Sequence, residues 1–436
     1  MTMNSSWAVL RNPVFRRLWI ASVISGTCVA AHNNVATSMM STLADSPLLI
    51  SLMSTVASLP FFLFTLPAGV LADRVNRKKL ACAINIWLAT IAVALAILGW
   101  LHLLNPYLIL ISAFLLGGGF ALNAPTWTSI VPQVVSTQEL GSAATLGGLQ
   151  FNISGIIGPA LGGLLVTLAD ANFVFLANGA CFLLVSLSIL CWKQPEAISK
   201  VSSESFSQSF RTIFGYVRSA PELQTMLARN FLFALFISAI PAVVPVIGLK
   251  VLNLNSGNLG LLFTSMGVGS VLGALFIAPW FRARFSSKTL TLWSNLSVIL
   301  AYGLMGIVHH IELFFLVAAL AGMGWTFSAS ELWVSAQRAI PDWARGRLNA
   351  TIIMVSQGAM VIGGVIWGSS VAIVGPGSTL LGAALLFLVS LLLSARLSID
   401  FTVRLVQWVS NILCVTGRSA EAAPMALTTD LSAAEY

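Results

Sequence analysis

Residues 69–79 read Gly-Val-Leu-Ala-Asp-Arg-Val-Asn-Arg-Lys-Lys, and this short basic segment lies between two long apolar stretches at about 48–71 and 80–102. Neither stretch contains Asp, Glu, Lys or Arg. A helix of roughly 20 apolar residues is long enough to cross the hydrocarbon core of a bilayer, which is about 30 Å thick. We therefore predict that residues 69–79 form a tight loop between two membrane-spanning helices.

The composition of the whole chain favours the same interpretation. Of its 436 residues, 57% are apolar and only 8% are charged, whereas soluble domains have about 45–50% and about 25%. In lipid, backbone polar groups must be bonded within a helix or a closed barrel. Barrel strands would alternate over about ten residues. The longer apolar stretches predict an all-α integral membrane protein.

Twelve such stretches can be placed along the chain, six in each half. They lie at about 15–40, 48–71, 80–102, 106–130, 145–168 and 172–192, and then at about 228–250, 257–280, 289–309, 313–335, 350–373 and 377–396. This divides the chain into an N-terminal six-helix bundle (1–192), a linker (193–227), a C-terminal six-helix bundle (228–397) and a tail (398–436).

Two apolar stripes predict helices that lie on the membrane surface, one in the linker and one in the tail. The first stripe comprises Phe206, Phe210, Ile213, Phe214 and Val217, and the second comprises Ile399, Val403, Val406 and Leu413. The end of the tail, residues 418–436, has few bulky apolar side chains and is expected to be disordered.

Basic residues gather in alternate loops. Of the 22 Lys and Arg residues, all except Lys250 fall at the termini or in loops that follow even-numbered spans. Lys and Arg concentrate on the cytoplasmic side of membrane proteins. We therefore expect both termini in the cytoplasm of a bacterium whose inner membrane holds the chain. The net charge of +8 then indicates topology and contact with anionic lipid, not nucleic-acid binding.

The two halves share a Gly-rich segment, GGGFALNAPTW at 117–127 and AGMGWTFSASELW at 321–333. Basic loops also follow the second span of each half, at 72–79 and 281–288. Parallel repeats of this kind are one architecture of transporters, with the substrate site at the interface of the repeats. The sequence thus predicts two six-helix pseudo-repeats with a midplane binding site.

The loop at 69–79 resembles the signature loop of the major facilitator superfamily, G-x-L-A-D-R-x-G-R-K. Asn76 stands where that pattern has Gly, and Asn tolerates a left-handed backbone better than most residues. The second-half copy, at 278–284, has no Asp. The resemblance implies the fold of that superfamily. It also implies a cytoplasmic latch formed by Gly69, Asp73, Arg74, Arg77 and Lys78.

Span 5 carries a second resemblance, to the G-P-x-x-G-G motif of antiporters in this superfamily. The matching residues are Gly155, Gly158, Pro159, Gly162 and Gly163. Glycines without side chains allow close helix packing, so ordinary membrane packing is the alternative. The stretch 340–347 resembles the P-x-x-x-R-G-R loop of a branch that includes bacterial enterobactin exporters and related siderophore or drug exporters. These motifs imply export.

Two ionisable residues are predicted to lie inside the membrane, Glu331 in span 10 and His32 in span 1. Such residues are functional candidates by default. Burial favours the neutral form of a carboxyl group, so we expect Glu331 to carry the coupling proton. Pairing of Glu331 with a nearby Arg is the alternative. His32 can titrate or bind an anionic substrate, or it can be a core histidine.

Binding pockets combine a few directed polar groups with apolar and aromatic walls. The candidates for substrate binding are Asn33, Asn34, Thr37, Trp127, Gln150, Asn152, Trp333 and Gln357. Hydrogen bonding between helices is the alternative role for each of them. Only His32 and Lys250 could balance a charged ligand, which disfavours a highly charged substrate.

We predict a monomeric secondary transporter that exports a small amphipathic molecule, a siderophore or a drug-like compound, by proton antiport and alternating access. An importer of a nutrient or metal chelate has the same fold and remains open, as does a non-transporting membrane receptor. No P-loop and no metal-ligand or nucleophile–base spacing occurs in the sequence. We therefore expect no metal, no cofactor and no enzymatic activity.

Asp73 tests the predicted latch. A carboxylate favours a helix N-terminus, and such a contact would hold the cytoplasmic side closed in one state of the cycle only. We expect Asp73→Asn to impair transport while leaving expression intact. Measuring export per amount of protein in the membrane checks this, and normal export by the variant would refute the latch.

Overall fold

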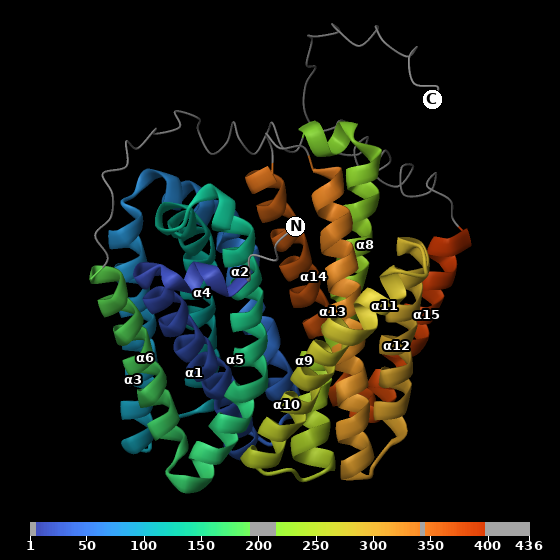
Figure 1. Ribbon diagram of the computed structural model, residues 1–436. Coiled ribbons are helices and arrows are strands. Elements are labelled where there is room, and N and C mark those ends of the chain that lie inside the picture. Colours follow the sequence, from blue (N-terminus) through green and yellow to red (C-terminus); the bar gives the residue numbers. More distant parts are fainter. Residues whose placement is uncertain (1–5, 192–214, 341–344, 397–436) are drawn as a thin grey trace, which may run out of the picture.

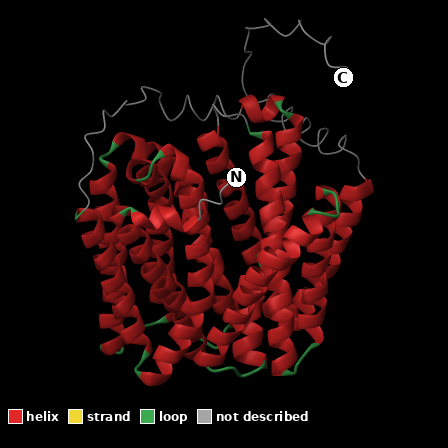
Figure 2. Cartoon of the chain, in the orientation of Figure 1, coloured by secondary structure: helices red, strands yellow, loops and turns green. Residues whose placement is uncertain are grey.

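A computed structural model describes residues 6–191, 215–340 and 345–396 of the chain. These residues are almost entirely helical, and no strand occurs among them (Figure 2). Twelve of the described helical segments are long and apolar enough to cross a membrane. The prediction of an all-α protein with twelve spans is confirmed.

The first six spans are single helices joined by short loops. Their bounds are α1 (Pro13–Leu43), α2 (Pro47–Arg74), α3 (Arg77–Trp100), α4 (Pro106–Val134), α5 (Leu140–Leu168) and α6 (Ala171–Leu190), with short 3₁₀ turns η1 (Ser6–Arg11) and η2 (Thr137–Glu139). Their starts are set by local chemistry. The side chains of Asn12, Asn105 and Asp170 accept backbone N–H groups at the starts of α1, α4 and α6, which satisfies donors that have no partner inside a helix.

Two of the last six spans contain a π-helical turn. The seventh joins α8 (Pro221–Ile237), α9 (Ala239–Val246) and the π turn η3 (Ile247–Val251), and the eighth joins α10 (Ser256–Leu272), the π turn η4 (Gly273–Ile277) and α11 (Ala278–Arg282). The remaining spans are α12 (Ser287–Ile307), α13 (Ile311–Ala339), α14 (Arg345–Val374) and α15 (Pro376–Arg396).

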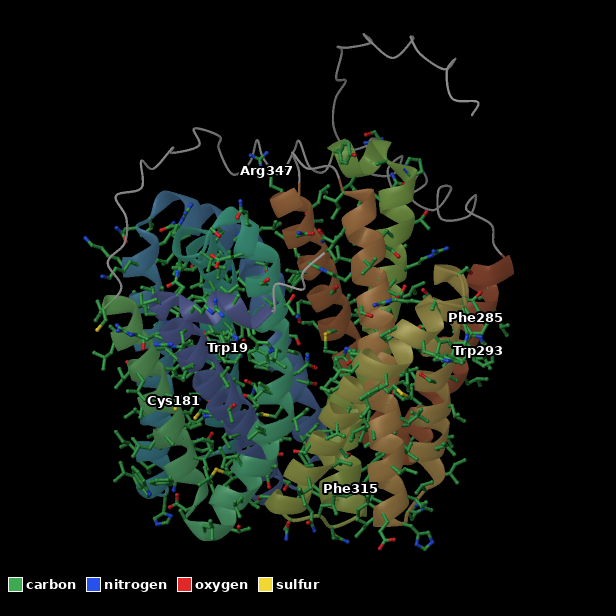
Figure 3. The ribbon with its side chains drawn as sticks, in the orientation of Figure 1. Trp19, Cys181, Phe285, Trp293, Phe315 and Arg347 are labelled. Atoms are coloured by element: carbon green, nitrogen blue, oxygen red, sulfur yellow. The ribbon has the colours of Figure 1, made fainter. Side chains whose placement is uncertain are left out.

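The twelve spans form two groups that lie side by side (Figure 1). We call α1–α6 the first bundle and α8–α15 the second bundle. They meet mainly where α2 lies against α14 and where α5 lies against α10. We call the end that carries the loop 74–77 the basic end, and the end that carries the loop 44–46 the opposite end. Arg347 also lies at the basic end (Figure 3).

Several helices extend beyond the predicted spans at the basic end. α5 begins at Leu140, α8 at Pro221 and α14 at Arg345, whereas we predicted starts at 145, 228 and 350. Hydropathy detects only the part of a helix that needs an apolar solvent, and a helix can continue into the headgroup region with polar residues.

Some predictions fall outside the described residues. These are the linker stripe up to Phe214, the tail 398–436 and part of the 340–347 motif. The predicted domain boundaries at 192 and 228 likewise stay predictions. Val217, the last residue of the linker stripe, is described and packs against a cluster that includes Leu223, Ala336 and Ile352.

The expectation for Asn76 was wrong. Its φ is −58° and its ψ is 114°, so the backbone is not left-handed. Its side-chain Oδ1 instead accepts a hydrogen bond of 3.1 Å from the N–H of Lys79. Asn is among the residues that best cap a helix N-terminus, and this cap fixes where the basic loop ends and α3 begins.

Candidate functional site

Three helices of the second bundle, α8, α13 and α14, enclose a cavity of about 250 Å³. Its wall is mostly apolar and aromatic, with a small number of polar groups. The lining residues are Met226, Asn230, Phe233, Ala234 and Ile237 of α8, Trp325, Ala329, Leu332, Trp333 and Ala336 of α13, and Ile352, Ile353, Ser356, Gln357 and Met360 of α14. This mixture is typical of a small-molecule site.

The cavity reaches from the basic end to the middle of the membrane. Met226 lies five residues into α8 and Ile237 lies sixteen residues in, which correspond to about 7 Å and 24 Å along the helix axis. On α14, Met360 lies fifteen residues from Arg345, or about 22 Å. A molecule in this cavity would therefore sit near the depth where transporters bind their substrates.

The polar groups of the cavity lie along α8 and α14. The Asn230 Nδ2 donates to Ser356 Oγ at 2.5 Å and to the Ile352 carbonyl oxygen at 3.4 Å. Neither Asn230 Oδ1 nor the Gln357 amide forms a hydrogen bond with the described residues. These two groups can therefore bond a ligand.

At the opposite end, the two bundles touch backbone to backbone where α5 crosses α10. A Cβ added at Gly260 would collide with the carbonyl oxygen of Pro159, and one added at Gly163 would lie 2.6 Å from the Gly257 Cα. Asn34 of α1 adds polar contacts, because its Nδ2 donates to the carbonyl oxygens of Pro159 (3.3 Å) and Ser256 (3.4 Å). This crossing closes the opposite end.

The antiporter-type motif supplies this closeness on two sides of α5. Gly158 and Gly162 lie against α1, where added Cβ atoms would collide with the Thr27 carbonyl oxygen and the Ala31 backbone. Pro159 and Gly163 lie against α10. The tight packing expected from these residues is present, while their role in antiport stays a prediction.

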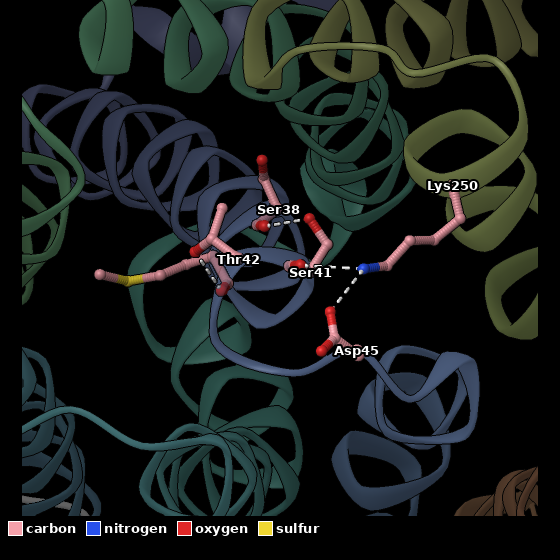
Figure 4. A network of polar contacts seen from close by, with 6 residues as sticks. Ser38, Ser41, Thr42, Asp45 and Lys250 are labelled. Carbon is pink, nitrogen blue, oxygen red and sulfur yellow. Dashed lines mark hydrogen bonds and ion pairs between the residues drawn. The ribbon is translucent and has the colours of Figure 1, made fainter.

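Lys250, in η3, joins the bundles at the same end (Figure 4). Its Nζ donates to the Ser41 carbonyl oxygen, in the last turn of α1, at 3.2 Å and lies 4.0 Å from the Asp45 carboxylate. A cation is favoured at a helix C-terminus. The Asp45 side chain is fully exposed, and exposed ion pairs contribute at most about 1 kcal/mol. The carbonyl contact is therefore the stronger one.

Toward the basic end, this packing of α5 is absent. Added Cβ atoms at Gly141, Gly147, Gly148 and Gly155 would meet nothing within 4 Å. Tight contacts of α5 begin only at Gly158. Among the described residues, the contacts of α5 with α10 thus lie in the half of the membrane next to the opposite end.

Of the predicted substrate-binding residues, Trp333 and Gln357 line the cavity. The others lie elsewhere. Gln150 Nε2 donates to the Ser22 carbonyl oxygen of α1 at 3.3 Å, and Asn152 Nδ2 donates to the Gly148 carbonyl oxygen of its own helix at 2.9 Å. Trp127 packs in a core cluster of the first bundle.

Two further candidates lie on α1. Thr37 Oγ1 donates to the carbonyl oxygen of Asn33, whose side chain is exposed. Asn34 belongs to the crossing described above. None of these three residues lines the cavity in the second bundle, so their contact with substrate stays a prediction.

Sequence reasoning missed Asn230, Ser356 and Trp325. We had placed Asn230 at the foot of a span that began at 228, because the polar residues before it lowered the hydropathy. A signal was present, since Asn230, Phe233 and Ile237 recur at helical spacing on one face.

Glu331 has the partner that we considered as the alternative. Its Oε1 accepts a hydrogen bond of 2.7 Å from Arg282 Nε, and its side chain is only 5% exposed. Arg282 also donates to Ser330 Oγ at 3.2 Å. On α13, Glu331 faces α11, away from the face that carries Trp333 and the cavity.

His32 also lies away from the cavity. It is buried in the first bundle against the Phe175 ring of α6, with ring centroids 4.6 Å apart. Its Nδ1 has no hydrogen-bond partner. A role for Glu331 or His32 in proton coupling stays a prediction.

The predicted latch is described only in part. α2 ends at Arg74 and α3 begins at Arg77, but the side chains of Asp73 and Arg74 lie outside the described part of the structure. Lys78 Nζ donates to the Leu190 carbonyl oxygen at 2.8 Å, which links the loop to the end of α6. The latch therefore stays a prediction.

We expect loss of the Lys250 contact to loosen the opposite end. A hydrogen bond from a charged donor is worth about 1.5–3 kcal/mol, so Lys250→Met should raise the labelling of a Ser38→Cys reporter by about tenfold. A membrane-impermeant maleimide added from the opposite side measures the rate. Gly260→Leu, which wedges α5 from α10, should raise it further.

Two matched variants control this measurement. Asp45→Asn should change labelling far less than Lys250→Met, because the Asp45 carboxylate is exposed. Gly303→Ala should change nothing, because a Cβ there meets no atom within 4 Å. Equal effects of Asp45→Asn and Lys250→Met would contradict the ranking of the two contacts.

Comparison with known proteins places this architecture in a family. A family described as transmembrane secretion effector matches residues 4–412. Macrolide efflux protein A of Streptococcus pyogenes is 20% identical over 313 residues, which cover 71% of this chain and 77% of that protein. The enterobactin exporter EntS of Citrobacter koseri is 25% identical over 348 residues, covering 78% and 80% of the two chains.

A third relative, the staphyloferrin A transporter of Staphylococcus aureus, is 22% identical over 310 residues, covering 70% and 77% of the two chains. Among solved structures, the nucleoside transporter NupG superposes with a TM-score of 0.68 at 13% identity, covering 90% of this chain and 99% of that one. Because the family match spans nearly the whole chain and the fold agrees, this protein belongs to the transmembrane secretion effectors, which are transporters of the major facilitator superfamily.

Proposed function

We propose that the protein is a secondary active exporter that moves a small amphipathic molecule out of the bacterial cytoplasm by proton antiport and alternating access. The cargo is a siderophore or a drug-like compound. The named activities of the relatives, macrolide efflux and enterobactin export, support the direction of transport. The motifs at 69–79 and 155–163 support it independently.

The observation that carries the proposal is the cavity between α8, α13 and α14. Its amphipathic wall reaches the membrane midplane from the basic end, while the opposite end is closed by the crossing of α5 and α10. A site reached from one side only is what alternating access requires of each state. With the basic end in the cytoplasm, this state is the one that loads cargo for export.

Return of the bundles to the other state requires the opposite end to open. The Lys250 contact with α1 and the contacts of Asn34 would then break. The Asp73 latch at the basic end would form instead and supply the compensating contacts. Alternate use of two sets of contacts keeps the two states close in free energy.

Glu331 is the proposed proton carrier. It is a buried carboxylate held by a partly exposed Arg282, and removal of that cation would leave it with nothing but desolvation, which favours protonation. We propose that movement of α11 relative to α13 during the cycle separates the pair and lets Glu331 take a proton. Buried His32 is a second candidate.

The cargo and the direction of transport are tested together by deleting the protein. We expect a deletion strain to retain one compound in its cytoplasm that the parent strain releases to the medium. Comparative metabolite analysis of cells and medium, with and without iron, measures this. Retention only under iron starvation identifies a siderophore. Reduced uptake of a compound from the medium would instead identify an importer.

Glu331→Gln tests the coupling. If Glu331 carries the proton, the variant should lose gradient-driven export by at least about tenfold while still exchanging labelled for unlabelled cargo, because exchange moves no net proton. Export from loaded cells and exchange in proteoliposomes measure the two activities. Export at the parental rate under a proton gradient would remove the proton role.

A structural role of the pair predicts a different outcome. Glu331→Gln and Arg282→Gln would then impair export and exchange equally, because both would disturb the packing of α11 on α13. Ser330→Ala serves as the matched control, since Ser330 contacts Arg282 but has no proton to exchange at neutral pH. It should leave both activities near the parental level.

A further inference from the structure

The cavity in the second bundle has no charged side chain in its described wall. Its fifteen lining residues are apolar or aromatic except for Asn230, Ser356 and Gln357, which are neutral. Placing an unpaired charge in a site of low dielectric costs several kcal/mol. A ligand with a carboxylate would therefore bring a charge that this wall cannot balance.

The chargeable groups of the spans are engaged away from the cavity. Glu331 pairs with Arg282 on the other side of α13. Lys250 contacts α1 at the opposite end, and His32 lies in the core of the first bundle. Arg229 precedes Asn230 in α8, but its side chain is exposed and does not line the cavity.

What the wall does offer is hydrogen bonding along one edge. Asn230 Nδ2 is already bonded to Ser356, so Asn230 presents its Oδ1, an acceptor. Gln357 presents both an acceptor and a donor. Hydroxyl and amide groups of a ligand satisfy such an edge, whereas a carboxylate, which only accepts, would face the Asn230 oxygen with nothing to donate.

The other face of the cavity suits flat or branched apolar groups. Trp325 and Trp333 lie eight residues apart on α13, or about 12 Å along the axis. The Trp333 side chain is 44% exposed, so its indole is free to cover a ring. Aromatic side chains supply large apolar contact areas together with an indole N–H donor.

We propose that this cavity selects an uncharged amphiphile with a ring or branched apolar face and a hydroxyl- or amide-bearing edge, and that it excludes carboxylate-bearing ligands. Recognition is carried by the second bundle alone, with Gln357 and Asn230 as the residues that set specificity. This choice rests on the proposed export function for its biological meaning. It separates the two cargo classes that the proposed function leaves open, in favour of uncharged compounds.

The test uses two probes that differ by one charge. Chloramphenicol is uncharged and carries a ring, an amide and hydroxyl groups, and its succinate monoester adds one carboxylate. We expect the purified full-length protein in lipid nanodiscs to bind chloramphenicol at least about tenfold more tightly than the succinate. Quenching of tryptophan fluorescence and isothermal titration measure both affinities.

A charge placed in the wall should reverse the preference. Gln357→Lys is expected to bind the succinate more tightly than chloramphenicol, and Trp333→Lys, at a more exposed position, should do the same if the first variant folds poorly. Trp293→Phe is the matched control, because Trp293 is exposed on the outside of α12 (Figure 3). It should leave both affinities unchanged, as should Arg229→Gln.

Three results would overturn the proposal. They are equal or tighter binding of the succinate by the parent protein, an unaltered preference in both lysine variants, and failure of the parent protein to bind either probe. Because binding is measured without a gradient, its outcome is separate from that of export. Export of an anionic cargo by cells would refute the selectivity and leave the proposed function intact.

Discussion

Hydrocarbon offers no compensation to a charge, and this constraint organises the protein. The few charged side chains described within the spans are each bound to a particular neighbour. Glu331 is bound to Arg282, and Lys250 lies at a helix end on the last carbonyl groups of α1. With these groups engaged, the cavity is left neutral, and contacts between the bundles are made by backbone and small polar groups.

The crossing of α5 and α10 follows from the same constraint. Side chains that meet in lipid gain little from the hydrophobic effect, because lipid tails are just as apolar. Close approach of backbones, as between Pro159 and Gly260, gains dispersion and brings the Asn34 amide within reach of two carbonyl oxygens. The contact is tight but contains no buried ion pair whose separation would be costly.

The fold could be predicted because each span carries its own signal. Apolar length and basic loops gave twelve helices without any knowledge of tertiary contacts. The site was predicted only where a local pattern pointed to it. Trp333 lies in a repeated Gly-rich segment, and Gln357 is a polar residue in a long apolar stretch.

What could not be predicted depended on contacts between distant segments. Lys250 stood out as the basic residue on the wrong side, but its partner is 209 residues away. Whether Glu331 is paired depended on the position of α11 relative to α13. Asn76 showed that a residue can replace Gly in a motif for a different reason, by capping the next helix.

The cavity and the crossing use different residues. Recognition lies on α8, α13 and α14, whereas the opposite end is closed by α1, α5, α10 and η3. Substitutions that reshape the cavity wall therefore leave the moving parts untouched. A lineage of such proteins can diversify its cargo by drift in one wall while inheriting an unchanged machine.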